Sequence, residues 1–280
     1  MIKKYDIAIA YRIYPKISKV PPVYPDDKYK LSELCLASLV KSLGDLKVKW
    51  FMILDDCPPE YHLMFQKYLL EEDTDYIHTK VKSNGKTFGM QMDLLLKQDF
   101  SEKIYFAEDD YFYLNDSFKE LTDAIDEPDF DFISPYDHLD LYRSEFHNRK
   151  YYIKFSGKRH WRSCGSTTMT FLTTKKTLRK TESVFRTYIH KNYDSSLWMT
   201  LTRDNVNNPF RFFKLLGKDS HTLKIFAKAW IYTSLRVIFG KKYSLFTPIP
   251  SMAQHLDNQC MAPGIDWNVK FEEGKSWLIK

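Results

Sequence analysis

The sequence predicts an α/β fold with a mostly parallel sheet and helices on its faces. Short apolar runs alternate with stretches of helical spacing over residues 5–125, which is typical of this class. Two of the runs, 49–54 and 104–107, end in adjacent acids, and open α/β sheets bind ligands at the carboxyl ends of their strands. With 44% hydrophobic and 16% aromatic residues, the 280-residue chain can also bury a large core.

The expected elements follow one another in regular alternation. A strand is expected where a short apolar run is rich in β-branched residues, and a helix where apolar residues recur every three or four positions. Gly44 marks the end of the first helix. The predicted strands are 5–11, 49–54, 76–81 (at an edge), 104–107 and 130–134, and the predicted helices are 31–43, 61–70, 90–97 and 118–125.

Three adjacent acids, Glu108, Asp109 and Asp110, follow the run 104–107. Neighbouring carboxylates repel one another unless a cation or hydrogen-bond donors gather them. Mg²⁺ and Mn²⁺ prefer such oxygen ligands and often share them with the phosphates of a substrate. The triplet is therefore either a site for a metal-held diphosphate or a solvated acidic turn.

The cysteines and the termini point to a cytoplasmic protein. No Cys-x-x-Cys spacing occurs, which favours reduced thiols over a disulfide framework or a zinc site. We expect neither a signal peptide nor a membrane span, because no apolar run reaches about 18 residues. His138, Asp140, His147 and His160 fit no compact zinc template and are interpreted as surface residues. The cysteines are Cys35, Cys57, Cys164 and Cys260.

The order of these motifs carries a family resemblance. Asp55-Asp56 ends one strand, Asn84-Gly-x-x-x-Gly89 opens a helix, and Glu108-Asp109-Asp110 ends the next strand. This series resembles the nucleotide-sugar-binding half of the GT-A glycosyltransferases, especially the family-2-like inverting members, over residues 5–115. The chain departs from the family in having Glu108 at the first position of its Asp-x-Asp signature, which leaves the donor open.

The resemblance implies roles for residues in the first half of the chain. Ala10, Tyr11 and Arg12 would line the base and ribose, and Asp55 or Asp56 would accept a hydrogen bond from the base. Lys86 would approach the diphosphate or base, Glu108 and Asp109 would face the ribose and sugar, and Asp110 would bind the metal. From the residues alone, Tyr11 could instead pack in the core, Lys86 could be a solvated cation, and Asp55 could form a turn.

The second half supplies three further matches. Arg162 and Gly165 lie in a segment that resembles the glycine loop at the donor sugar, although an ordinary hairpin corner has the same pattern. Asp194 begins an apolar helical run where inverting members have their catalytic base, although it could also be an N-cap. His255, in Pro250-Ser-x-x-x-His, resembles the residue that completes the metal shell. A neutral imidazole suits Mn²⁺ better than Mg²⁺, so Mn²⁺ (or Mg²⁺) is the expected cofactor.

Residues 209–243 are basic and rich in apolar side chains, with Asp219 as their one acid. This pattern predicts helices that lie on an anionic membrane surface, or helices packed on the catalytic domain with basic outer faces. No nucleic-acid module accompanies the charge, so we expect no nucleic-acid partner. We divide the chain into a catalytic domain (1–208), this helical segment (209–243) and a segment that returns to the active site (244–280).

The resemblance predicts a metal-dependent, inverting hexosyl- or N-acetylhexosaminyltransferase. It would move a sugar from a nucleotide-diphosphate donor to a glycan or lipid-linked acceptor in polysaccharide biosynthesis, at the inner face of the membrane. The alternatives are a nucleotidyltransferase acting on a sugar phosphate and a catalytically silent nucleotide-sugar-binding module.

Overall fold

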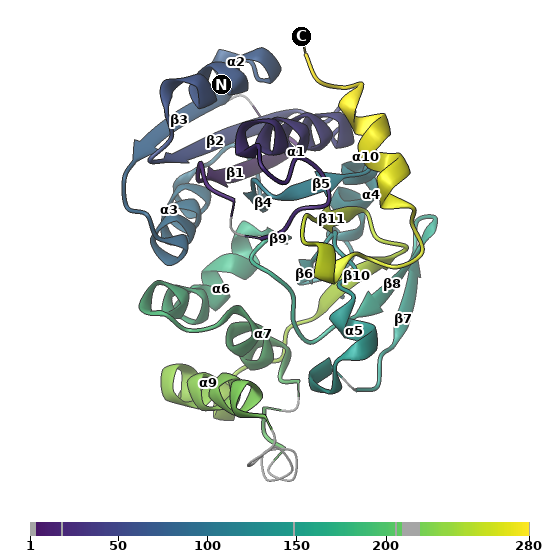
Figure 1. Cartoon of the computed structure of the whole chain (residues 1–280). Coiled ribbons are helices and arrows are strands. Elements are labelled where there is room, and N and C mark those ends of the chain that lie inside the picture. Colours follow the sequence, from purple (N-terminus) through teal and green to yellow (C-terminus); the bar gives the residue numbers. More distant parts are fainter. Residues whose placement is uncertain (1–3, 18, 148, 205, 209–218, 280) are drawn as a thin grey trace.

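The structure is a computed structural model that describes residues 4–17, 19–147, 149–204, 206–208 and 219–279. Its centre is a nine-stranded sheet (Figure 1). Of these nine strands, only β8 and β9 run against the others. The predicted α/β fold with a mostly parallel sheet is therefore confirmed. The strands in spatial order are β3 (Thr74–Thr79), β2 (Val48–Asp55), β1 (Ile7–Ile13), β4 (Lys103–Glu108), β9 (Phe171–Thr174), β6 (Phe132–Ile133), β10 (Leu245–Ile249), β8 (Arg159–Ser163) and β7 (Ile153–Ser156).

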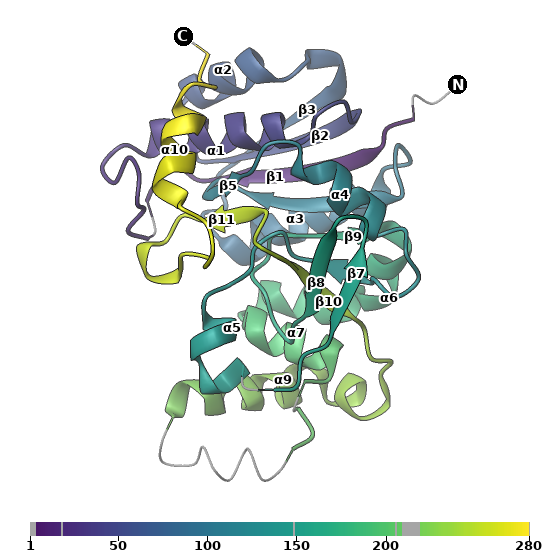
Figure 2. The same cartoon turned by 90° about the vertical axis from the view of Figure 1, so that its right-hand side faces the viewer.

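Each face of the sheet has its own hydrophobic core. Successive residues of a strand point to opposite faces. In β1, Ile9 and Tyr11 therefore enter one core, whereas Ala8 and Ala10 enter the other. Helices cover both faces and make three layers (Figures 1 and 2). The first core is covered by α1 (Lys28–Ser42), α2 (Pro59–Tyr68), α4 (Ser117–Ala124) and α10 (Trp267–Lys275), and the second by α3 (Asn84–Lys97), α6 (Lys175–Phe185) and α7 (Asp194–Thr202).

Helix α3 begins six residues before the predicted start at 90, at Asn84. The Ser83 hydroxyl caps it by accepting a hydrogen bond from the amide of Lys86 at 3.4 Å. Gly85 is useful there despite its poor helix propensity, because a Cβ at this position would lie 2.8 Å from the carbonyl oxygen of Tyr188. The helix start therefore packs directly on a neighbouring backbone.

A small second sheet brings the C-terminal part of the chain to the end of β4. It pairs β5 (Tyr111–Tyr113) with β11 (Ala253–His255) in antiparallel register. This register sets His255 opposite Tyr111, the residue that follows Asp110. It also brings His255 to Asp110, although these two residues are 145 positions apart in the sequence.

Helix α9 (Ser220–Phe239) packs against α7 at the end of the molecule away from α2 and α10 (Figures 1 and 2). Its buried side chains include Ile225, Phe226 and Ala229, and it kinks at Thr233. The remaining short elements are α5 (Asp140–Arg143) and 3₁₀ turns at Glu71–Asp73, Glu145–His147, Arg186–His190 and Asn258–Cys260.

Of the predicted segment 209–243, residues 209–218 lie outside the described residues. After α9 the chain enters the central sheet as β10, between β6 and β8. The division into residues 1–208, 209–243 and 244–280 stays a prediction. Among the described helices, none combines the length and the apolar character needed to cross a membrane.

Candidate active site

Three parallel strands end side by side, and the residues after them line an open pocket. The register pairs Arg12 of β1 with Glu108 of β4, while Ile13 pairs with Leu54 of β2. The carboxyl ends of such strands are where α/β sheets bind ligands. The pocket has a volume of about 90 Å³ and is lined by Arg12, Ile13, Tyr14, Lys16, Lys28, Asp55, Asn84, Thr87, Glu108, Asp109 and Asp110.

The buried Arg12 forms an ion pair with the half-buried Glu108, and both residues line the pocket. The guanidinium of Arg12 also donates to the carbonyl oxygen of Asn84 at 2.5 Å and to the Thr87 hydroxyl at 3.3 Å. The other carboxylate oxygen of Glu108 accepts a hydrogen bond from the Thr170 hydroxyl at 2.8 Å. Arg12 thus joins β1, β4 and the start of α3, and Glu108 is held by donors on both of its oxygens.

Asp109 is paired with Lys28, the first residue of α1. The Lys28 Nζ lies 2.6 Å from Asp109 Oδ2, and the backbone amide of Tyr14 donates to the same oxygen at 3.4 Å. Burial raises the pKa of Asp109, and the charge of Asp110 adds to this effect, whereas Lys28 opposes it. Lys28 therefore brings a largely buried positive charge to the acidic end of β4.

Asp110 is paired with His255. The His255 Nε2 lies 3.2 Å from Asp110 Oδ2, and the Tyr111 ring stacks on the imidazole with 5.0 Å between centroids. Burial opposes the charged form of both groups, but their attraction dominates. It lowers the pKa of Asp110 to about 2 and raises the pKa of His255. The other oxygen, Asp110 Oδ1, is buried without a hydrogen-bond partner among the described residues.

The two acids after β2 differ in position. Asp55 lines the pocket, and its Oδ1 accepts a hydrogen bond from the backbone amide of Lys82 at 3.1 Å. Asp56 has a left-handed backbone (φ 55°) and pairs with the Lys82 Nζ at 2.6 Å. Lys86 is exposed on the first turn of α3. Asp55 is thus the acid of the pair that reaches the pocket.

Asp194 is the first residue of α7 and is half-buried. Its Oδ1 accepts hydrogen bonds from the amide and hydroxyl of Ser195 at 2.6 and 3.3 Å. The helix cap itself is Tyr193, without a side-chain capping bond. Burial raises the pKa of Asp194, the Ser195 hydrogen bonds lower it, and repulsion from Glu108 raises it further. The two carboxylates therefore interact electrostatically, although Asp194 does not line the pocket.

Two residues predicted at the base and ribose do not line the pocket. Ala10 and Tyr11 are fully buried, and the sheet separates them into opposite cores. Burial raises the pKa of the Tyr11 hydroxyl well above its usual value. The residues of this segment that line the pocket are Arg12 and Ile13, the last two residues of β1, and Tyr14, which follows them.

The two residues named in the predicted glycine loop, Arg162 and Gly165, do not line the pocket either. Arg162 forms a buried ion pair with Asp137, and its guanidinium carbon lies 4.2 Å from the centre of the Tyr142 ring. At Gly165 a Cβ would lie 2.2 Å from the carboxylate of Asp204. Both residues are therefore part of close packing between β8 and its neighbours.

We expect Arg162→Ala to lower the free energy of unfolding by about 3–5 kcal/mol, because it leaves the buried Asp137 carboxylate without its cation. Urea denaturation measures this change. Arg162→Ala with Asp137→Ala should cost less than the sum of the two single changes. Unchanged stability together with weaker donor binding would contradict the structural role and favour the donor-sugar role.

One pocket residue, Lys28, and two residues that support the pocket from behind its lining, Thr170 and Gln91, carried no recognisable motif. Lys28 follows a proline-rich loop and reaches Asp109 only because α1 starts there. Thr170 lies 62 residues from Glu108 and reaches it through the antiparallel neighbour of β4. Gln91 is fully buried and donates to the carbonyl oxygens of Ala10 and Ala107 at 2.7 and 2.9 Å. The sequence did signal one neighbouring part of the pocket, because Asn84, the first residue of the Asn-Gly-x-x-x-Gly motif, lines it.

No protein-family model matches the chain, and no curated protein gives a significant match. Among solved structures, the galactosyltransferase LgtC in complex with donor and acceptor sugar analogues has a TM-score of 0.47 at 12% identity, over 98% of this chain and 96% of that one. The glycosyltransferase GlyE of Streptococcus pneumoniae TIGR4 has a TM-score of 0.42 at 16% identity, over 99% and 65%. The 4-diphosphocytidyl-2C-methyl-D-erythritol synthase of Anaerococcus prevotii has a TM-score of 0.41 at 10% identity, over 70% and 81%. These likenesses are weak, and the function of the chain therefore rests on its own side chains.

Proposed function

We propose that the chain is a GT-A glycosyltransferase that moves a sugar from a nucleotide-diphosphate donor to a glycan or lipid-linked acceptor. The observation that carries this proposal is the pairing of Asp110 with His255 beside the pocket at the ends of β1, β2 and β4. The acid and the imidazole come from positions 145 residues apart in the sequence. Asp110 Oδ1 is left without a hydrogen-bond partner among the described residues.

Asp110 and His255 would hold Mn²⁺ or Mg²⁺. Their donor set fits Mn²⁺ well, since it combines carboxylate oxygen with imidazole nitrogen. The buried Asp110 Oδ1 accepts no hydrogen bond from the described residues, so its lone pairs could bind a cation. When bound, the metal neutralises charge on the departing nucleoside diphosphate. Lys16 and Lys28 also line the pocket and would add positive charge near the same phosphates.

The other pocket residues would orient the donor. Asp55 would accept a hydrogen bond from the base, and Asp109 and Glu108 would face the ribose and sugar. Arg12 holds Glu108 in one geometry through its ion pair, so this carboxylate needs little reordering on binding. The donor would thus lie along the ends of three strands, with its diphosphate toward Asp110.

Asp194 would be the catalytic base. Inversion requires a carboxylate that takes the proton of the acceptor hydroxyl as its oxygen attacks the anomeric carbon opposite the leaving phosphate. Burial raises the pKa of Asp194, which makes its carboxylate a stronger proton acceptor than a solvated aspartate. Its electrostatic contact with Glu108 supports a position near the sugar end of the donor.

A screen of nucleotide sugars with and without Mn²⁺ tests the proposal. A true donor at 100 times its Kd should stabilise the fold by about 2.7 kcal/mol, which a thermal unfolding assay detects. Incubation with acceptor glycans should then release a nucleoside diphosphate. Release of pyrophosphate from a nucleoside triphosphate and a sugar phosphate would show a nucleotidyltransferase instead. Binding without any product would leave a silent binding module.

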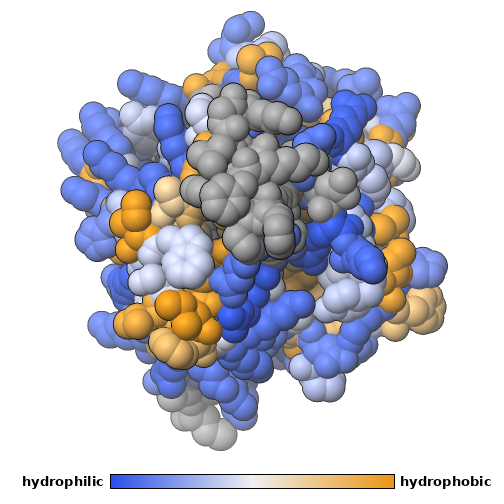
Figure 3. Space-filling model, turned by 90° about the horizontal axis from the view of Figure 1, so that it is seen from below, coloured by the Kyte–Doolittle hydropathy of each residue, from blue (hydrophilic) through white to orange (hydrophobic). Residues whose placement is uncertain are grey.

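We also propose that α9 lies on the inner face of an anionic membrane. Ile231, Leu235 and Phe239 recur at four-residue spacing on this helix and are 76%, 74% and 81% exposed. Lys241 and Lys242 follow directly and are exposed as well. Figure 3 looks at this end of the molecule, where hydrophobic side chains gather beside hydrophilic ones. Such a mixture is typical of helices in a membrane interface.

Changing Ile231, Leu235 and Phe239 together to serine should weaken binding to phosphatidylserine-containing vesicles at least about tenfold, because burying one such side chain stabilises by about 1.5–3 kcal/mol. Vesicle sedimentation measures the change. The matched control changes Leu63 and Leu70, which are 60% and 66% exposed near α2, and should bind like the parent.

The charges give a second, independent check on the membrane proposal. Of the basic residues on α9, Lys228 donates to the carbonyl oxygen of Lys191, and Arg236 donates to that of Lys180 at 3.4 Å. Reversal of the exposed Lys224, Lys241 and Lys242 should therefore release the protein with less damage to the fold. Each contributes about 1 kcal/mol of attraction. Equal vesicle binding by all variants would contradict the proposal.

A further inference from the structure

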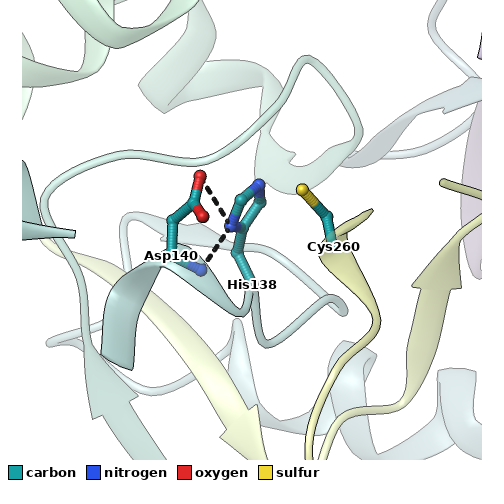
Figure 4. A group of neighbouring side chains, drawn as sticks. All are labelled: His138, Asp140 and Cys260. Carbon is teal, nitrogen blue, oxygen red and sulfur yellow. Dashed lines mark hydrogen bonds and ion pairs between the residues drawn. The ribbon is translucent and has the colours of Figure 1, made fainter. Parts of the chain in front are cut away.

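A second group of metal-ligand side chains lies outside the pocket. One ligand atom each of His138, Asp140 and Cys260 lie within 4.8 Å of one another. In Figure 4 the imidazole of His138 lies between the carboxylate of Asp140 and the thiol of Cys260. His138 lies in the loop after β6, Asp140 begins α5, and Cys260 ends the 3₁₀ turn Asn258–Cys260. The topology therefore joins residues that are 120 positions apart in the chain.

We propose that His138, Asp140 and Cys260 bind a zinc ion. Imidazole, carboxylate and thiolate together are a donor set typical of Zn²⁺, whereas Mg²⁺ and Ca²⁺ prefer oxygen alone. Three protein ligands leave a fourth position for water, and the Asp140 side chain is about half exposed, so solvent reaches the group. Small side-chain movements that shorten the distances between the three ligand atoms would give the spacing of a tetrahedral site.

The surroundings of the group are negative. The carboxylates of Asp140 and Asp257 act electrostatically on the Cys260 sulfur, and Lys19, which pairs with Asp257 at 3.7 Å, offsets part of their charge. The two nearby carboxylates favour a cation at the sulfur. The backbone amide of Asp140 donates to His138 Nδ1 at 3.0 Å, which holds the ring in the group before any ion binds. The ion would replace this contact or bind the ring at its other nitrogen.

The ion would fasten the C-terminal segment next to the Asp110–His255 pair. Tyr136 donates its hydroxyl hydrogen to the carbonyl oxygen of Cys260, and its ring lies 5.1 Å from that of His138 and 6.2 Å from that of His255. A bond through Cys260 would therefore stabilise the turn that follows β11, the strand that carries His255. This zinc site does not depend on the proposed glycosyl transfer.

Cobalt absorption spectroscopy tests the site on the full chain. The reduced, chelator-treated protein is titrated with Co²⁺, and one equivalent should produce the near-ultraviolet absorption of a cobalt–thiolate bond, which Zn²⁺ then removes. Cys260→Ser should abolish this band. Cys57→Ser is the matched control, since Cys57 is the other partly exposed cysteine, and it should keep the band. Competition with a chromophoric chelator should show zinc affinity lowered at least about tenfold in His138→Ala and in Asp140→Asn.

Asp110→Ala separates this site from the proposed catalytic metal. It should keep the cobalt–thiolate band even if it loses donor binding, because Asp110 supplies no ligand to the sulfur site. The zinc proposal is overturned if the folded parent gives no band, if Cys260→Ser keeps it, or if Cys57→Ser removes it. A zinc affinity that is unchanged in both His138→Ala and Asp140→Asn would equally overturn it. Circular dichroism without metal checks that each variant is folded.

Discussion

Asp110→Ala is expected to abolish the Mn²⁺-dependent stabilisation by the nucleotide-sugar donor, which is about 2.7 kcal/mol at 100 times Kd for the parent. The variant removes the carboxylate that has one oxygen on His255 and the other without a partner among the described residues. The metal would then have neither its oxygen ligand nor an oriented imidazole. His255→Ala removes one ligand and should weaken binding while Asp110 still holds part of the site. Thermal unfolding with donor, with and without Mn²⁺, measures the stabilisation in both variants.

The control for loss of an acid is Asp123→Ala, an exposed residue of α4 that pairs with Lys119. It should bind donor and metal like the parent. Asp110→Asn adds a control for shape, since it keeps the size of the side chain but lacks the charge that a metal requires. Mn²⁺-dependent donor binding that survives in both Asp110 variants would contradict the metal assignment at this position.

The order of elements along the first half of the chain was predictable because it depends on local patterns. The run 104–107 is apolar on both sides, as a strand covered by helices must be, and it became β4 in the middle of the sheet. The acids after β2 and β4 then follow from chain direction alone, because parallel strands present their carboxyl ends at one edge. The position of Asp55, Glu108 and Asp109 around the pocket is thus encoded locally.

Which side chains face the pocket was harder to predict. Ala10 and Tyr11 adjoin Arg12 in the sequence, yet strand alternation and burial send both into the cores, and the lining begins with the last two residues of β1. The residues around Arg162 suggest a cation in a loop. Its partner Asp137, however, lies 25 residues away in the sequence, and the pairing of β8 with β10 fixes the position of Arg162. No spacing rule in a single sequence encodes such a contact.

Distance along the chain also concealed the His138 group. With His138 and Asp140 alone, the spacing matches no compact zinc template, and Cys260 seemed a solitary thiol. The two parts meet because β10 and β11 return the chain to the edge of β5 and β6. The same return carries His255 to Asp110, which the family resemblance anticipated and the local sequence did not.

Asp194→Asn is expected to lower kcat by about 10²–10⁴ while the donor affinity stays near that of the parent. The amide keeps the size of the side chain and can still accept the hydrogen bonds from Ser195, so the start of α7 should remain folded. It cannot take a proton from the acceptor hydroxyl. Product release under saturating donor and acceptor measures kcat, and donor titration measures the affinity separately.

The pH dependence and the product stereochemistry extend this test. Burial and Glu108 raise the pKa of Asp194, so the parent should lose activity on acidification at a higher pH than a solvated aspartate would allow, because only the ionised carboxylate accepts a proton. The residual activity of Asp194→Asn should lack this dependence. A product with the anomeric configuration of the donor, or an Asp194→Asn enzyme with the kcat of the parent, would contradict inversion with Asp194 as base and leave the metal assignment at Asp110 intact.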